Sequence, residues 1–201
     1  MPEFIFNAGH LALDLVNTEQ VSGGAWVDLL GSPAALLDWL RRSGAVTPAQ
    51  LNMGEKALLR DQAAAEALLL RARRLRSAVR QMAEAIVRGR AISDTVMATI
   101  NSVLADSPQV PKLVRGSKGY ALKWHHRGPA EAVLLVPVAE AAARLLTEGD
   151  SSRLRKCANP ACILYFYDTT RSRTRHWCSM QGCGNRAKAA RFYGRRHGGG
   201  S

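Results

Sequence analysis

The sequence predicts an α+β fold: a mostly helical N-terminal domain that includes a small antiparallel β-sheet, followed by a small cysteine-rich module. The 201 residues are 47% hydrophobic, which is typical of a globular chain long enough to bury a core. Residues 1–150 are nearly neutral, with 17 Lys and Arg against 15 Asp and Glu, whereas residues 151–201 have 11 against one. All four cysteines also lie in this C-terminal part. We therefore place a domain boundary near residue 150.

Helix signals recur through the N-terminal part and are separated by turn signals. Ser32-Pro33 and Thr47-Pro48 each combine a capping residue with a proline typical of a first helical turn, and Gly44 and Gly89 are typical stops. Ala, Leu, Arg and Glu dominate the longest segment and favour helix. Two apolar runs around Gly116–Gly119 instead indicate a β-hairpin. The expected elements are a strand at 4–6, helices at 9–17, 33–42, from 48 onward, 55–88, 91–105 and 129–147 (the last bent at Pro137), and a hairpin at 112–124.

The cysteines are spaced as two pairs, Cys157-x4-Cys162 and Cys178-x4-Cys183, with fifteen residues between the pairs. Two short pairs joined by a turn-rich stretch can complete a tetrahedral metal site. Zinc suits four thiolates best, so we expect one structural Zn²⁺ with these four ligands, in a zinc finger built from a knuckle, a β-hairpin and a helix. An Fe(Cys)4 centre would use the same ligands. Two disulfides are a further alternative, in an oxidising compartment.

The sequence contains no targeting or catalytic signal of the common kinds. The N-terminus has no basic region followed by an apolar stretch, and no run approaches the ~18 apolar residues that cross a bilayer. We therefore expect a cytoplasmic protein without a membrane partner, where disulfides are disfavoured. No spacing establishes a nucleophile beside a base, and four thiolate ligands leave no position for a catalytic water, so we do not expect an enzyme.

The formal charge of +12 is concentrated in the cysteine-rich module. Arginines occupy every second position over residues 171–175, interleaved with Ser and Thr, and in an extended chain they would share one face. A helix after the last cysteine would place further basic residues on one side. We therefore expect a DNA-binding surface. RNA, an acidic protein partner and a merely solvated charged face are the alternatives. The predicted phosphate-binding residues are Arg171, Arg173, Arg175, Lys188, Arg191 and Arg195.

Two features of the N-terminal part allow more than one interpretation. On a helix, His10, Asp14 and Asn17 would lie on one face at i, i+4 and i+7. They could line a pocket for a small effector molecule, or Asp14 and Asn17 could satisfy backbone groups at element ends. The long segment over residues 55–88 could form the core or the interface of a homodimer.

The motif Cys183-Gly184-Asn185-Arg186, preceded by residues 175–179, resembles the CGNR zinc finger family, whose middle segment resembles residues 164–171. Residues 9–18, Gly-His-Leu-Ala-Leu-Asp-Leu-Val-Asn-Thr, resemble the start of the ABATE domain that usually precedes this finger. The resemblance spans nearly the whole chain. It implies a bacterial transcription regulator linked to stress, with a finger that binds DNA.

The resemblance also implies roles for the three residues after Cys183. Gly184 would allow a tight turn after the last ligand, and Asn185 would cap the following helix. Arg186 would pack back toward the knuckle or bond a backbone carbonyl. The implied division is an ABATE-like domain for sensing or dimerisation over residues 1–150, a CGNR finger over 151–197, and a flexible tail over 198–201.

Overall fold

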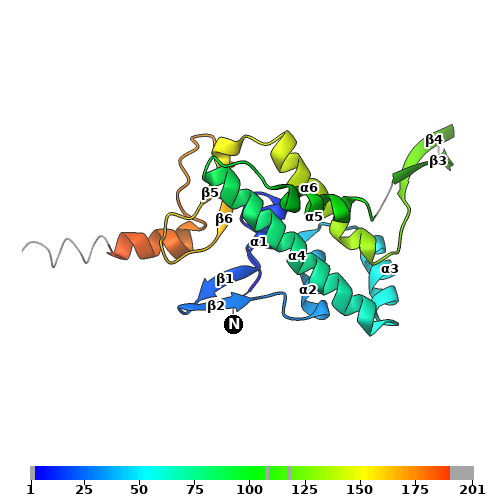
Figure 1. The fold of residues 1–201 in the computed structure, drawn as a ribbon, viewed down its shortest axis with the longest axis horizontal. Helices are drawn as coiled ribbons and strands as arrows, with labels where there is room; N and C mark the ends of the chain where they lie inside the picture. Colours follow the sequence, from blue (N-terminus) through cyan, green and yellow to red (C-terminus); the bar gives the residue numbers. More distant parts are fainter. Residues whose placement is uncertain (1–2, 107–108, 117–118, 191–201) are drawn as a thin grey trace, which may run out of the picture.

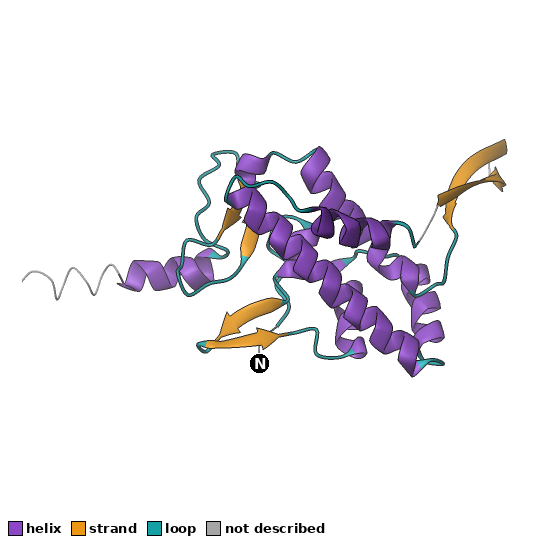
Figure 2. Ribbon diagram, in the orientation of Figure 1, coloured by secondary structure: helices purple, strands orange, loops and turns teal. Residues whose placement is uncertain are grey.

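The structure is a computed structural model that describes residues 3–106, 109–116 and 119–190. Helices form the body of this part, and two-stranded antiparallel sheets lie around it (Figures 1 and 2), which confirms the predicted α+β class. The helices are α1 (Leu11–Val16), α2 (Pro33–Ser43), α3 (Pro48–Leu58), α4 (Gln62–Val87), α5 (Asp94–Leu104) and α6 (Val136–Thr147). The paired strands are β1 (Glu19–Ser22) with β2 (Ala25–Asp28), β3 (Gln109–Gly116) with β4 (Gly119–His126), and β5 (Leu154–Lys156) with β6 (Tyr165–Tyr167).

Helix α4 is the centre of the body. It contacts α1, α2, α3 and α5 as well as strand β5 (Figure 1). The short helix α1 packs across α4, and its residues Leu13, Leu15 and Val16 are fully buried in the same core. The apolar stripe of α4 is therefore part of the core of this chain.

Capping residues fix the predicted starts of α2 and α3. The Ser32 hydroxyl accepts a hydrogen bond from a backbone amide one turn into α2, and this helix ends at Gly44, where φ is +66°. Thr47 and Gln50 form a reciprocal capping box at the start of α3. The short helix expected at residues 9–17 is also present, as α1. Local sequence signals therefore set these elements.

Two predicted helices have different bounds in the structure. The single helix expected over residues 55–88 is wrong, because α3 ends at Leu58 and the Asp61 carboxylate caps a new helix, α4. Good helix formers on both sides hid this cap. The helix expected over 129–147 is shorter: a 3-10 turn precedes α6, and Pro137 lies in the first turn of α6, where proline is tolerated.

The region before α2 differs most from the prediction. Residues 4–6 form no strand, because within the described residues their backbone pairs with no neighbouring strand; Phe4 contacts the main core, whereas Ile5 contacts the cysteine cluster. The β1–β2 hairpin was not predicted. Its turn contains Gly23 and Gly24, both at positive φ, and a Gly-Gly pair is a recognised hairpin turn signal.

A buried arginine holds the β1–β2 hairpin against α4. Glu19 and Asp28 lie directly opposite each other in the hairpin, and Arg76, 3% exposed, reaches both. Its guanidinium donates to the two Asp28 carboxylate oxygens at 2.5 and 2.7 Å and lies 3.1 Å from Glu19 Oε1. Burial alone would raise the pKa of Asp28, but the hydrogen bonds and charge of Arg76 lower it. The pair therefore stays ionised and fixes the hairpin.

The hairpin predicted at residues 112–124 is confirmed as β3–β4. Lys112 pairs with Lys123, and Leu113 pairs with Leu122 in the antiparallel register. The hairpin projects from the body at the end opposite β5, β6 and the C-terminal helical residues (Figure 1).

Candidate metal centre and nucleic-acid interface

The four cysteines converge on one point. All are buried, and their Sγ atoms lie within 4.8 Å of one another. The Sγ–Sγ distances are 3.8 Å for Cys162–Cys178 and 3.6 Å for Cys178–Cys183. A tetrahedral zinc with bonds of about 2.3 Å has sulfur–sulfur edges of about 3.8 Å. The cluster therefore fits a closed Zn(Cys)4 site. The disulfide alternative is wrong, since all four cysteines are free.

Tight turns present each pair of ligands. Cys157 follows β5, and its amide donates to the carbonyl of Leu164 just before β6. Between the first two ligands, the Asn159 side chain accepts a hydrogen bond from the Ala161 amide at 3.1 Å, and the Asn159 carbonyl accepts one from the Cys162 amide at 2.9 Å. The residues Asn159-Pro160-Ala161 suit such a turn. The β5–β6 hairpin and this knuckle together place the first pair.

Hydrogen-bond donors surround the sulfurs. The Cys178 amide lies 3.4 Å from Cys157 Sγ, and Asn159 Nδ2 lies 3.3 Å from Cys183 Sγ. Arg186 Nη2 donates to the same Cys183 sulfur at 3.1 Å. Zn²⁺ with four thiolates carries a charge of about −2, which such donors and the guanidinium offset. Arg186 therefore packs back toward the knuckle, as expected, but it bonds a ligand sulfur in place of a backbone carbonyl.

The thiols of the cluster differ in acidity. Hydrogen bonds from the Cys162 and Cys178 thiols lower the pKa of Cys157, and the hydrogen bond to Cys157 raises the pKa of Cys162 to about 12. A divalent cation between the sulfurs would favour the thiolate at all four positions.

The helical segment after Cys178 is capped differently from the expectation. The Ser179 hydroxyl accepts from the Gly182 amide at 3.2 Å and starts a π-helical turn, Met180–Gly184, which continues into helical residues 185–190. Asn185 therefore does not cap the helix, because it lies inside this helical path with φ −67° and ψ −39°. Gly184 does not make a tight turn either. A Cβ there would come within 2.8 Å of the Met180 sulfur, so glycine provides space.

Arg175 faces the interior of the finger. Its guanidinium lies 4.3 Å from the centre of the Phe166 ring and donates to the carbonyls of Trp177, Cys178 and Asn7. Residues 171–175 do not form the extended chain in which the three arginines would share one face, since the chain turns at residues 171–172 and Arg173 has a φ of +54°. Arg171, Arg173 and Arg175 therefore do not share one face, and Arg175 holds the finger together.

Asp168 is the only acidic residue of positions 151–201, and it is completely buried. Its carboxylate accepts hydrogen bonds from the Thr170 amide and hydroxyl at 2.9 and 2.6 Å, and from the Arg175 amide at 2.9 Å. Burial alone would raise the pKa of Asp168, but these hydrogen bonds lower it. The one negative side chain of the module is therefore used internally and is hidden from solvent.

The finger is joined to the helical body through strand β6. The buried Asn17 side chain donates to the Tyr165 carbonyl at 2.8 Å and accepts from the Tyr165 amide at 3.1 Å. Two residues along, the Tyr167 amide donates to the Ala8 carbonyl at 2.7 Å. Gly9 has a φ of +74°, and a Cβ there would lie 2.6 Å from the Tyr167 carbonyl oxygen. The 9–18 motif and the residue before it therefore provide hydrogen-bond partners for the backbone of β6.

The other two polar residues of that motif lie beside this junction. Asp14 Oδ1 accepts a hydrogen bond from the Ala8 amide at 3.0 Å. Burial raises the pKa of Asp14 to about 6, against the opposing effects of this bond and the charge of Arg175. Burial lowers the pKa of His10, whose ring lies 6.1 Å from that of Tyr167. Two roles were considered for Asp14 and Asn17. In the structure both side chains hydrogen-bond backbone groups, as in the second of these roles.

Family models match nearly the whole chain. Residues 9–149 match ABATE, described as "Putative stress-induced transcription regulator", and residues 153–196 match the CGNR zinc finger. The chain belongs to the ABATE family. Its four cysteines form the single structural zinc site of a CGNR finger. A comparison with curated proteins finds no match.

Exposed basic residues lie both on the body and on the finger of this ABATE-family protein, and three of the predicted phosphate-binding residues are among them. Arg171 and Lys188 are exposed, and Arg173, also exposed, lies 3.1 Å from Asp150. Arg191 and Arg195 fall outside the described residues, as does the tail at 198–201. Within the residues that the structure describes, no helix is long and apolar enough to cross a membrane.

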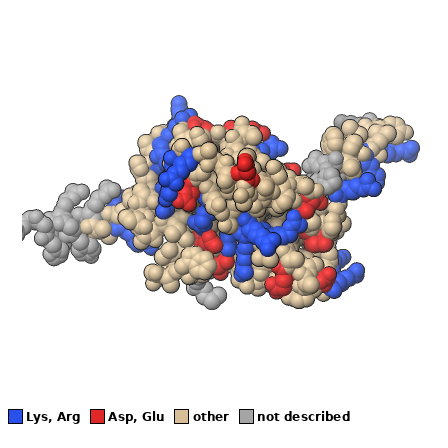
Figure 3. All heavy atoms as spheres, viewed as in Figure 1, with Lys and Arg blue, Asp and Glu red and all other residues tan. Residues whose placement is uncertain are grey.

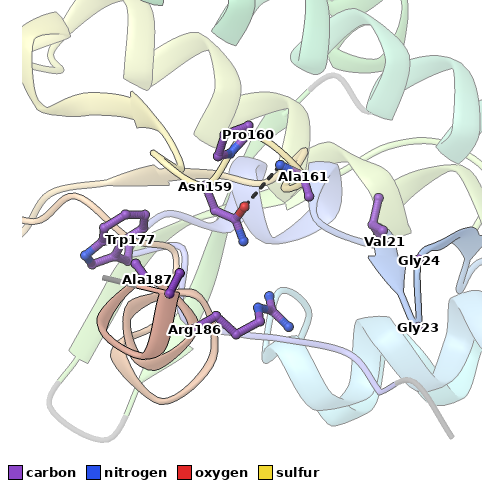
Figure 4. Close-up of a pocket in the computed structure, with 10 residues that line it drawn as sticks. Val21, Gly23, Gly24, Asn159, Pro160, Ala161, Trp177, Arg186 and Ala187 are labelled. Carbon is purple, nitrogen blue, oxygen red and sulfur yellow. Dashed lines mark hydrogen bonds between the residues drawn. The ribbon is translucent and has the colours of Figure 1, made fainter. Parts of the chain in front are cut away.

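A pocket of about 600 Å³ lies between the finger and the body (Figure 4). The β1–β2 turn forms one wall, and the knuckle turn at Asn159 and the C-terminal helical residues form the others. Figure 4 shows the Arg186 side chain extending from its helix across this space, and Trp177, which also lines the pocket, beside the same helix. The pocket is largely apolar, and Arg186 is the charged residue that lines it.

Proposed function

We propose that this protein is a DNA-binding transcription regulator whose zinc finger contacts the phosphate backbone. The observation that carries the proposal is the burial of Asp168. Because the only acidic side chain of residues 151–201 is buried and hydrogen-bonded, no acidic side chain of the finger itself offsets its exposed cations; Arg173 lies 3.1 Å from Asp150, which precedes the finger. Backbone binding depends on such a surface, since each neutralised phosphate releases counterions.

The residues best placed for this role are Arg171, Arg173 and Lys188, which are exposed. Hydroxyls of neighbouring Ser172 and Thr174 can donate to phosphate oxygens as well. Arg175 is left out, because its guanidinium is turned inward. Membership in a family described as transcription regulators supports DNA as the partner.

A binding role is preferred to catalysis. A zinc held by four thiolates has no open position for water or substrate, so its contribution is to fold the finger. That contribution is large for such modules, because binding of structural zinc is coupled to folding. Four free thiols at one site also fit a reducing compartment, and we therefore place the protein in the cytoplasm.

The test uses the zinc-loaded full chain and a fluorescent DNA duplex. With three phosphate contacts, the logarithm of the binding constant should fall with the logarithm of salt with a slope of about −2.7, or about 40-fold between 50 and 200 mM salt. Arg171→Glu and Lys188→Glu should each make this slope shallower by about one. Arg60→Glu, an exposed change in the turn just before α4, is the matched control and should leave the slope unchanged.

Two outcomes would contradict the proposal. If the finger variants bind the duplex as well as the unmodified protein does, the finger is not the interface. If a pulldown from cell extract recovers a protein partner that survives nuclease treatment, while the purified chain binds no duplex, the finger is a protein-interaction module. RNA of the same length serves as a competitor, and preferential competition by RNA would reassign the ligand.

A further inference from the structure

The β3–β4 hairpin is nearly isolated from the rest of the molecule. It extends away from the helical body (Figure 1), and in the described residues its two strands pack mainly against each other. A two-stranded hairpin alone is marginally stable in water. Such an arm therefore gains most from a partner that covers one of its faces.

The register places the large apolar side chains on one face, beside Arg115, and both lysines on the other. The cross-strand pairs Pro111–Trp124 and Leu113–Leu122 lie on one face, together with the pair Arg115–Tyr120. The four large apolar residues of this face are 60–72% exposed, namely Leu113, Tyr120, Leu122 and Trp124. The opposite face carries the pair Lys112–Lys123 beside the pair Val114–Ala121.

The charge of the hairpin argues against a polyanion on the apolar face. Residues 109–127 contain five Lys and Arg and no Asp or Glu, whereas the other residues of 1–150 have 12 against 15. Figure 3 shows basic side chains on the projecting hairpin and mixed charges on the body. Lys112 and Lys123, however, lie on the face away from Trp124 and Leu122. A nucleic acid drawn to these lysines would leave the apolar face in water.

We propose that the apolar face of β3–β4 binds the same face of a second copy of this chain. Two sheets that stack face to face lie about 10 Å apart. Because each helical body is much wider than this distance, the two hairpins must point in opposite directions so that the bodies do not overlap. A two-fold axis across the strands places Trp124 of one copy over Tyr120 of the other, and Arg115 over Pro111. The aromatic pair is favourable, and the lysines stay in solvent on the outer faces.

The exposed area of the apolar face gives the size of this interface. The two aromatic and two leucine side chains expose about 500 Å² per copy, given about 150–250 Å² for a whole aromatic side chain. The pair would bury about 1,000 Å², which is the lower limit of specific interfaces. We therefore expect a dissociation constant in the micromolar range. The proposal is independent of DNA binding, because it concerns the opposite end of the molecule.

Sedimentation velocity of the zinc-loaded full chain tests the proposal. At about 0.3 M salt, where charges are screened beyond ~6 Å, the sedimentation coefficient should rise from monomer to dimer as the protein concentration increases. Leu122→Lys should weaken the dimer at least tenfold. Ala121→Lys is the matched control: it adds the same charge at the neighbouring residue of the same strand, on the opposite face, and should change dissociation less than about twofold.

Three results would overturn the proposal. The first is a chain that stays monomeric up to about 200 µM, well above a micromolar dissociation constant. The second is equal weakening by Leu122→Lys and Ala121→Lys, which would indicate a charge or edge effect in place of face-to-face packing. The third is a monomer that binds vesicles of anionic phosphatidylglycerol through Leu122, which would assign the face to a lipid surface. Unchanged melting temperatures of both variants verify that the body remains folded.

Discussion

Replacing Asn17 with leucine should loosen the zinc finger from the helical body. Asn17 is buried in α1's C-terminal cap, and its side chain bonds both the amide and the carbonyl of Tyr165, 148 residues along the chain. Leucine has nearly the same shape as asparagine but neither donates nor accepts hydrogen bonds. The Asn17→Leu variant therefore leaves two backbone groups of β6 without these partners.

The expected cost follows from those two groups. A buried donor or acceptor left unpaired costs about 1–3 kcal/mol, so the free energy of unfolding should fall by about 2–6 kcal/mol. For a chain of this size each kcal/mol corresponds to about 2–4 °C. The melting temperature of the zinc-loaded protein should therefore fall by at least about 4 °C. Zinc should also be released faster to a chelator, because β6 helps to position the knuckle.

Thermal melting followed by near-ultraviolet circular dichroism measures the first effect, and a colorimetric chelator measures the second. Asn101→Leu, the same change at an exposed position of α5, is the control and should stay within about 0.5 kcal/mol of the unmodified protein. If Asn17→Leu melts at the same temperature as Asn101→Leu and releases zinc at the same rate, Asn17 does not join the finger to the body.

Further predictions concern three other residues. Cys162→Ser should lose most of the bound zinc by elemental analysis and the finger's near-ultraviolet dichroism; full zinc retention would disprove the four-thiolate site. Asp14→Asn should stabilise the protein above pH 6 by about 1–2 kcal/mol after allowance for solvent screening, and should have little effect below about pH 4. The reason is that a pKa raised to about 6 makes ionisation of Asp14 destabilising as the pH rises from about 4 to 6. If the melting temperatures of Asp14→Asn and the unmodified protein differ by the same amount at both pH values, this reason is refuted. Arg175→Lys should cost about 2–4 kcal/mol through lost carbonyl bonds and stacking on Phe166, yet leave the salt dependence of DNA binding unchanged. A salt slope shallower by one in that variant would instead place Arg175 on a phosphate.

Features that depend on neighbouring residues could be predicted from the sequence. Ser32 and Thr47 act on amides within three residues, and the spacing of the cysteines is itself the geometry of a tetrahedral site. The cap at Asp61 was missed because strong helix formers flank it on both sides. Gly23-Gly24 is a local signal for the first hairpin, because a Gly-Gly pair is typical of a two-residue hairpin turn.

Features that depend on distant contacts could not be predicted. The alternation of arginines suggested one phosphate-binding face, but Phe166 and three carbonyls draw Arg175 inward. The role of Asn17 depends on β6, which approaches only after the chain has folded. For Asp168 the sequence did carry a signal: a lone acid in a strongly basic module is a candidate for an internal role.

The salt dependence of duplex DNA binding by the zinc-loaded full chain tests the central claim most directly. The claim is that a zinc-closed finger with its only carboxylate buried presents cations to phosphates. It predicts a straight line of log binding constant against log salt with a slope of about −2.7 or steeper. A slope near zero, or no binding at low salt, would contradict it.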